Sequence, residues 1–479
     1  MVPTLLGLLF LVAALFLAFR GDAMSMLEMV LVSSLFGGSA ALLLPALGGA
    51  SVPPLQVLIG IAIIRLVLLS NRRVGALRSS VSANILFALF CVYGVICAFL
   101  APRYFAGAIE VVPLRGSYVE RTLFDTTPLV FTSQNITVST YLISDLFAAM
   151  IGFLAVLSQD GPFRFARVAI FVTWAHIFFG VTASLLKGTP YDLFIDFLRN
   201  ANYSQVDQSI EGFSRINGIF PEPSSYTAYG FAWLVLMFEF WLRDILPRRT
   251  GPAAVAMTFV LIATTSSTAY VSIAAYLIIV IARLVLFPQA LEARKAFVGV
   301  VAALVIITGT AMALFWLPNV SAKLGTMFWG LTIGKQQSES GIQRAFWAHI
   351  GLEAFKVSRA VGIGPGSFRS SSLATAMLGS VGIVGTALFL AHLVRALRPL
   401  KMSTYYGASY SSVYGEATLV GAAAAWGAVG ALIPLVFISA SCDPSAVFAI
   451  FTGVALSLRS AGRTARYKSL ESYRIPSIH

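Results

Sequence analysis

The chain has 479 residues, of which 58% are hydrophobic and only 11% are charged, and its mean hydropathy is +0.84. This composition excludes a water-soluble domain of this size, which would expose large apolar patches, and it predicts an integral membrane protein. The net charge of +13 indicates basic loops on the cytoplasmic side of a membrane rather than a nucleic-acid partner.

Continuous apolar runs predict an all-α fold, because about 20 helical residues cross a bilayer with every backbone hydrogen bond satisfied internally. We therefore expect residues 1–479 to form a single integral membrane domain, a polytopic bundle of about thirteen helices. The runs lie at about 2–19, 24–44, 53–70, 83–100, 138–157, 168–186, 226–242, 252–267, 269–287, 297–317, 377–394, 417–437 and 445–458.

The distribution of basic residues predicts the orientation of this bundle. Most of the 33 Lys and Arg residues fall in alternate loops on one side, which also holds the basic tail 459–479. The positive-inside rule makes this side cytoplasmic, so the long connections 101–137, 187–225 and 318–376 face outward. A short amphipathic segment in the second connection, YDLFIDFLRN, is expected to lie in the lipid headgroup layer.

The second outer connection ends in the motif RINGIFPEPSSY, from Arg215 to Tyr226. Arg215 offers a planar set of donors suited to phosphate or carboxylate. Two prolines stiffen the backbone around Glu222, and Ser224 can cap the next helix, whose N-terminal amides favour an anion. The alternative interpretation is that Arg215 only pairs with Glu211 or Glu222 and that the prolines only mark re-entry into lipid.

Two further stretches combine polar groups with turn residues. Thr264 to Thr268, TTSST, interrupts an apolar run, either as a turn facing a wet cavity or as helix-packing hydroxyls. In the third outer connection, a helix-like stretch with the proton-transfer candidate His349 precedes VGIGPGSFRSSS, although a lone histidine can equally be structural. Basic or close-approach candidates for phosphate binding here are Arg344, Arg359, Gly364, Gly366 and Arg369.

These motifs, in this order, resemble those of the O-antigen ligase and Wzy-type polysaccharide polymerase superfamily of bacterial inner-membrane glycosyltransferases. The resemblance rests on RINGIFPEPS, TTSST, Arg344-x-x-Trp347, GIGPGSF and LGSVGIVG, within residues 210–395. It implies a GT-C-like helical fold with periplasmic loops, and a donor glycan linked through pyrophosphate to undecaprenol. Arg215 and Arg344 match the basic positions that hold the pyrophosphate, and neither metal nor cofactor is expected.

Two departures favour a polymerase over a ligase. Ser370 to Ser372 stand where ligases typically have a histidine, and Ser267-Thr268 stand where they often have an arginine. The predicted function is therefore joining of undecaprenyl-pyrophosphate-linked oligosaccharide repeat units at the periplasmic face. The expected catalytic residues are Arg215, Glu222, Arg344 and His349, and the expected substrate-binding residues are Arg215, Ser224, Tyr226, Arg344, Arg359, Gly364, Gly366 and Arg369.

The expected partners are the lipid-linked oligosaccharide, membrane lipids, a chain-length regulator and a flippase, with no nucleic acid. The alternatives are a ligase that transfers the glycan to a lipid A core, a lipid-linked glycan flippase or transporter, and a peptidoglycan polymerase of the shape, elongation, division and sporulation type. A transporter predicts repeated halves and ionisable residues along a central path, whereas the polar groups here gather in one-sided loops.

Overall fold

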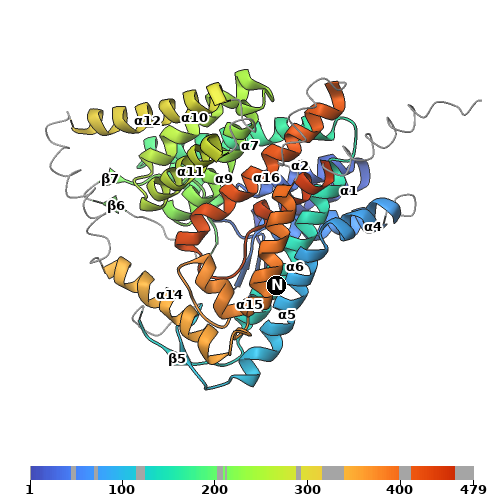
Figure 1. Ribbon diagram of the computed structural model, residues 1–479, viewed down its shortest axis with the longest axis vertical. Helices are drawn as coiled ribbons and strands as arrows, with labels where there is room; N and C mark the ends of the chain where they lie inside the picture. Colours follow the sequence, from blue (N-terminus) through green and yellow to red (C-terminus); the bar gives the residue numbers. More distant parts are fainter. Residues whose placement is uncertain are drawn as a thin grey trace, which may run out of the picture.

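A computed structural model describes residues 2–44, 50–68, 74–114, 124–201, 209–210, 213–286, 293–315, 339–398 and 412–458. These residues are mostly helical and contain only short strands, so the expected all-α class is confirmed for the part of the chain described (Figure 1). The first half contains β1 (Val2–Pro3), α1 (Leu5–Arg20), α2 (Ala23–Ser33), β2 (Leu42–Leu44), β3 (Ala50–Val52), α3 (Pro54–Leu68), α4 (Val74–Ala83), α5 (Ile85–Tyr104), β4 (Glu110–Val111), β5 (Thr127–Pro128), α6 (Ser133–Ala155) and α7 (Gly161–Leu185).

The second half continues this pattern of apolar helices joined by longer connections. It contains α8 (Tyr191–Leu198), β6 (Ser209–Ile210), β7 (Phe213–Ser214), α9 (Pro223–Leu242), α10 (Pro247–Ala263), α11 (Ser267–Leu286), α12 (Ala293–Phe315), α14 (Glu339–Val357), α15 (Leu373–Leu397), α16 (Ser412–Ile438) and a last helix, Ala446–Leu458. The strands form three small antiparallel sheets, β1-β2-β3, β4-β5 and β6-β7.

Each predicted apolar run coincides with a helix, but the helices differ in their capacity to cross a membrane. Within the described ranges, six are long and apolar enough by length and composition, namely Ile85–Tyr104, Ser133–Ala155, Gly161–Leu185, Ser267–Leu286, Leu373–Leu397 and Ala417–Ile438. The structure is thus compatible with a membrane protein, while the thirteen crossings and their orientation stay predictions. The run expected at 24–44 is shortened, because α2 ends at Ser33 and the chain turns before β2.

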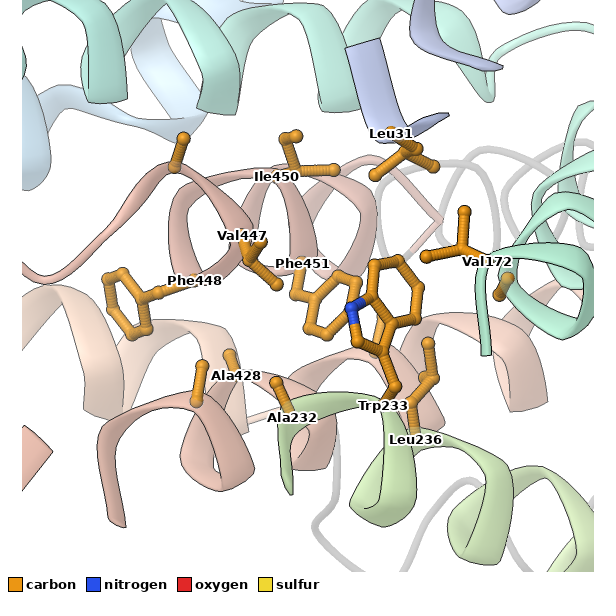
Figure 2. Packing of buried hydrophobic residues seen from close by; sticks show 14 of the residues in the cluster. Leu31, Val172, Ala232, Trp233, Leu236, Ala428, Val447, Phe448, Ile450 and Phe451 are labelled. Atoms are coloured by element: carbon orange, nitrogen blue, oxygen red, sulfur yellow. The ribbon is translucent and has the colours of Figure 1, made fainter. Parts of the chain in front are cut away.

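The core of the bundle is built around α9 and α16, which cross the middle of the molecule (Figure 1). Trp233 of α9 is completely buried and packs edge-on against Phe451 of the last helix, with ring centroids 5.2 Å apart. Figure 2 shows these two rings among apolar side chains, including Leu31 and Val172 of neighbouring helices and Leu236 of α9. Large buried aromatic side chains dominate such cores, so this packing fixes the position of α9.

Several charged residues within the helices form ion pairs. Glu239 of α9 is completely buried and bonds to Arg243 and Arg283. At another interface, Arg164 of α7 donates to Glu28 of α2 from Nε over 2.9 Å. Paired charges of this kind are what an apolar surrounding requires.

Described parts of the first and third long connections pack together at one end of the molecule, where Figure 1 places β5 and α14. Val111 and Val112 of the first connection share a hydrophobic cluster with Trp347 of α14. The backbone N–H of Arg369, in the third connection, donates to the carbonyl of Val112 over 2.8 Å. These contacts bring segments far apart in the sequence to one place.

Candidate functional site

The N-terminus of α9 holds a carboxylate in a fixed position. Glu222 is the residue that precedes the helix, in extended conformation, and Pro223 opens the first turn, where its missing N–H costs nothing. The hydroxyls of Ser224 and Ser225 donate to Oε1 of Glu222 over 2.6 and 3.3 Å. The predicted serine is therefore a partner of Glu222, and the carboxylate is oriented by its own helix.

Arg215 connects the RINGIFPEPSSY motif with the TTSST turn. Its Nη2 donates to the carbonyl of Thr265 over 3.3 Å. Thr265 lies in the left-handed region at φ 50°, between the end of α10 and the start of α11. The side chains of Thr264 and Thr227 also approach each other, with 3.3 Å between their hydroxyl oxygens. Two motifs separated by about fifty residues thus meet at Arg215.

The third long connection also contributes arginines near Arg215. Burial lowers the pKa of Arg215, Glu222 and Tyr270 raise it, and Arg344 lowers it again, so these groups act on one another electrostatically. Arg344 belongs to α14, and its carbonyl accepts a 2.6 Å hydrogen bond from the hydroxyl of Ser371. The structure therefore brings Arg215 and Arg344, the two positions taken from the family resemblance, close to each other.

Arg369 is the third member of this group. Its guanidinium lies over the ring of Trp347, 4.4 Å from the centroid, so an aromatic face supports the cation. Burial lowers the pKa of Arg369 and the Glu222 carboxylate raises it. We call Arg215, Arg344 and Arg369 the arginine cluster.

The arginine cluster gathers positive charge around Glu222. This carboxylate acts on both Arg215 and Arg369. Arginine stays protonated even when its pKa falls, because its ordinary pKa is above 12. Three guanidiniums beside a helix N-terminus favour an anion with several oxygens.

The glycine-rich loop that carries Arg369 is held by a break in α15. Gly382 interrupts the helix with φ 59° and ψ −159°, and the N–H of Ile383 donates to the carbonyl of Ala360 over 2.9 Å. The carbonyls of Gly379 and Ser380 then accept from Ile363 and Gly364 over 2.8 and 3.0 Å. The LGSVGIVG and GIGPGSF motifs are thus two halves of one backbone-paired unit.

The predicted ligand-facing glycines contact protein backbone in this unit. Gly364 and Gly366 adopt φ angles of 97° and 82°, and both are buried. A Cβ at Gly364 would lie 2.7 Å from the carbonyl oxygen of Cys97, and one at Gly366 would lie 2.4 Å from that of Gln134. Their lack of a side chain therefore lets the loop pack against α5 and α6.

Asn135 is a supporting residue that the sequence reasoning missed. It is completely buried in the first turn of α6 and donates from Nδ2 to the carbonyl of Pro365 over 2.8 Å and to the hydroxyl of Ser367 over 2.9 Å. The signal that could have located it is the Thr132-x-x-Asn135 capping box, which marks a helix start at the edge of the first connection.

A second missed element is the segment between α16 and the last helix. The N–H of Ser370 donates to the carbonyl of Ala440 over 3.0 Å, directly after Arg369 in the chain. Ser445 lies in the left-handed region at φ 83°, and its N–H donates to Oδ1 of Asp443 over 2.8 Å. The segment between α16 and the last helix therefore supports the loop that carries Arg369.

The remaining predicted residues lie elsewhere. His349 is on the exposed face of α14, with Nε2 3.7 Å from Oε1 of Glu353, and at about 100° per residue it points about 140° away from Arg344. Arg359 is exposed at the C-terminal end of α14, with φ 51°. Tyr226 is completely buried, and its hydroxyl donates to the carbonyl of His176 over 3.0 Å.

A pocket of about 320 Å³ lies apart from the arginine cluster and has a different character. Its walls are mostly apolar side chains of α9, α10, α11 and α12. Tyr276 also lines the pocket, and its hydroxyl donates to Oε1 of Glu239. Within the described residues, no group of three or more His, Cys, Asp and Glu side chains is arranged to hold a metal ion.

Comparison with known proteins adds no relative: no protein-family model matches the chain, and no curated protein matches it in sequence. The arginine cluster and the motifs that form it are therefore the basis for assigning a function.

Proposed function

We propose that this protein is a polysaccharide polymerase of the Wzy type, a membrane glycosyltransferase that joins oligosaccharide repeat units carried on undecaprenyl pyrophosphate. The observation that supports this proposal most directly is the convergence of Arg215, Arg344 and Arg369 with Glu222. These residues come from two connections that are more than one hundred residues apart in the chain.

The arginine cluster suits a pyrophosphate leaving group. In the proposed reaction, an acceptor hydroxyl oxygen bonds to the anomeric carbon of the donor sugar. The bond from that carbon to the pyrophosphate oxygen breaks, and the electron pair leaves with the lipid pyrophosphate. Guanidiniums fixed at the departing oxygens stabilise the charge that develops there, which is the main contribution that an enzyme makes to such a step.

Glu222 is the proposed acceptor of the proton that the attacking hydroxyl loses. It is half-buried, and both serine hydroxyls hold Oε1, so the carboxylate has one orientation relative to Arg215. His349 was the other candidate, and its exposed position opposite Arg344 favours Glu222. The site is proposed to face the periplasm of a bacterial inner membrane, where lipid-linked repeat units are expected.

The test is an assay with defined substrates. Purified protein in phospholipid vesicles is mixed with undecaprenyl-pyrophosphate-linked repeat units, without nucleotide sugar, and the products are sized on a gel. A ladder of polymer lengths is expected. Transfer only to an added lipid A core acceptor would replace the polymerase by a ligase, and movement of intact donor across the vesicle membrane without new glycosidic bonds would replace it by a flippase.

A further inference from the structure

Helix α8, between α7 and the RINGIFPEPSSY motif, exposes three large apolar side chains. Leu193 is 75% exposed, Phe194 is 46% exposed and Phe197 is 37% exposed. At about 100° per residue these three positions form one continuous sector of the helix. Ile195 and Leu198 form a second sector, which is buried against the protein.

A third sector of α8 is polar. Asp192, Asp196 and Arg199 share this sector, and Arg199 lies 3.5 Å from Asp196. Oδ2 of Asp192 accepts from the backbone N–H of Gly188 over 2.7 Å. The helix therefore has one face for the protein, one for polar surroundings and one apolar face that water would not cover favourably.

The position of α8 identifies what covers the apolar face. Its first residue is tied to the end of α7, because the hydroxyl oxygens of Tyr191 and Thr182 are 2.9 Å apart. Helix α7 is long and apolar enough to cross a membrane, and its residues Phe171, Phe178 and Leu185 form an exposed stripe with a spacing of seven residues. The apolar face of α8 thus begins where a lipid-facing stripe ends.

This end of α7 is the end at which the arginine cluster lies. A Cβ at Gly218, in the RINGIFPEPSSY motif, would lie 3.2 Å from the backbone nitrogen of Gly180 in α7. Helix α8 is also linked to this motif, because Ala201 donates to the carbonyl of Gly38 over 3.1 Å and Gly38 donates to the carbonyl of Ile219 over 2.9 Å.

We propose that α8 is an interfacial helix that inserts Leu193, Phe194 and Phe197 among the acyl chains of the membrane leaflet on the side of the arginine cluster. A helix in this position lies parallel to the surface, with its polar sector among the headgroups. Through Gly38 and Ile219 it sets the depth of the Arg215 loop relative to the lipid phosphates. The proposal does not depend on the glycan chemistry proposed above.

The experiment measures the depth of single spin labels in phosphatidylcholine–phosphatidylglycerol vesicles. Labels are attached at Leu193→Cys and Phe197→Cys, with Asp196→Cys as the polar control on the same helix and Phe178→Cys as the lipid-facing reference. The native Cys91, Cys97 and Cys442 are buried, so they contribute little label. Thermal unfolding of each variant in detergent checks that the labelled protein is folded.

We expect labels at Leu193 and Phe197 to collide with oxygen as often as the label at Phe178, and to collide with a water-soluble nickel chelate about fivefold less often than the label at Asp196. Equal nickel collisions at Leu193, Phe197 and Asp196 would place the face in water and overturn the proposal. Low collision rates with both reagents would mean that protein covers the face, as in an assembly of two copies, and would overturn it as well.

Discussion

Helix α9 carries a carboxylate near each of its ends, and the surroundings of the two differ. At the C-terminal end Glu239 is completely buried and is bonded by Arg243, Arg283 and Tyr276. At the N-terminal end Glu222 is half-buried, receives two serine hydroxyls and faces the arginine cluster.

The difference separates a structural cluster from a proposed binding site. Every contact of Glu239 ties α9 to itself or to α11, and the guanidinium of Arg283 also lies 3.7 Å from the ring centroid of Trp426 in α16. Around Glu222, guanidiniums from two connections act on one half-buried carboxylate. Buried ion pairs between helices hold the helices together, whereas several guanidiniums beside a half-buried carboxylate are suited to an anion that comes from outside.

The strongest test of this comparison is Glu222→Gln. It removes the proposed proton acceptor while keeping the shape of the side chain, so polymer formation should fall about 10²- to 10⁴-fold with little change in thermal unfolding. The rate of ladder formation measures the effect. Wild-type activity in this variant would remove Glu222 from the mechanism and leave the arginines as the working part of the site.

At the other end of α9, Glu239→Ala should affect stability. It leaves Arg243 and Arg283 buried without this carboxylate, which typically costs about 3–5 kcal/mol. Unfolding in detergent measures the loss. The matched control is Asp244→Asn, because Asp244 pairs with Lys295 over 2.5 Å but is 57% exposed, and loss of its charge should cost about 0–1 kcal/mol at a left-handed backbone position that asparagine tolerates. Equal losses in the two variants would refute the contrast.

Arg215→Ala should lower polymer formation about 10²- to 10³-fold, the usual cost of losing one group that stabilises developing charge. Arg215→Lys should recover only part of this loss, since an ammonium cannot present a planar pair of donors. The control is Lys356→Ala, in which the lost cation is exposed on α14 and pairs with Glu353 over 2.8 Å. If Arg215→Ala polymerises as well as Lys356→Ala, the charge of Arg215 does not contribute to catalysis.

Gly382→Ala tests whether backbone pairing positions the arginine cluster. Its Cβ would lie 2.1 Å from the carbonyl oxygen of Ala360 at a φ of 59°, so we expect a loss of about 1–3 kcal/mol in unfolding free energy together with reduced polymerisation. Gly60→Ala in α3 is the control, because its Cβ meets nothing within 4 Å and the change should be neutral or stabilising. Similar behaviour of both variants would contradict the role of the break in α15.

The smallest effect is expected for His349→Gln. The side chain of His349 is 62% exposed and faces away from Arg344, so polymerisation should change by less than about twofold. Assays across pH 5.5 to 8 check the prediction, because a working histidine would make the profile of the wild type differ from that of the variant. A large loss would return His349 to the mechanism in place of Glu222.

The sequence predicted the positions of the helices better than the long-range contacts that hold them together. Apolar runs located the helices, and the sequence singled out Arg215, Glu222 and Arg344 as site candidates before the structure showed that Glu222 and Arg344 act on Arg215. Helical periodicity places His349 about 140° from Arg344, but it does not show which face of α14 the rest of the protein covers. The burial of Tyr226 followed from contacts with α7, which no local pattern encodes.

The missed features share one physical cause. Asn135, Gly382 and the turn at Ala440 all act through hydrogen bonds between backbone groups, or between a side chain and backbone, of segments far apart in the chain. Residue type indicates that a glycine can adopt a positive φ, but it does not indicate which carbonyl will lie beside it. The number of membrane crossings stays a prediction for a related reason, since hydropathy measures the apolar character of a helix and not its tilt.

The bond between the N–H of Ser370 and the carbonyl of Ala440 also bears on biosynthesis. A chain is made from its N-terminus, so the loop that carries Arg369 leaves the ribosome long before the residue on which it rests. This bond can therefore form only after α16 has been made. A chain that stops before Ala440 would contain every arginine of the cluster without the carbonyl that accepts from Ser370.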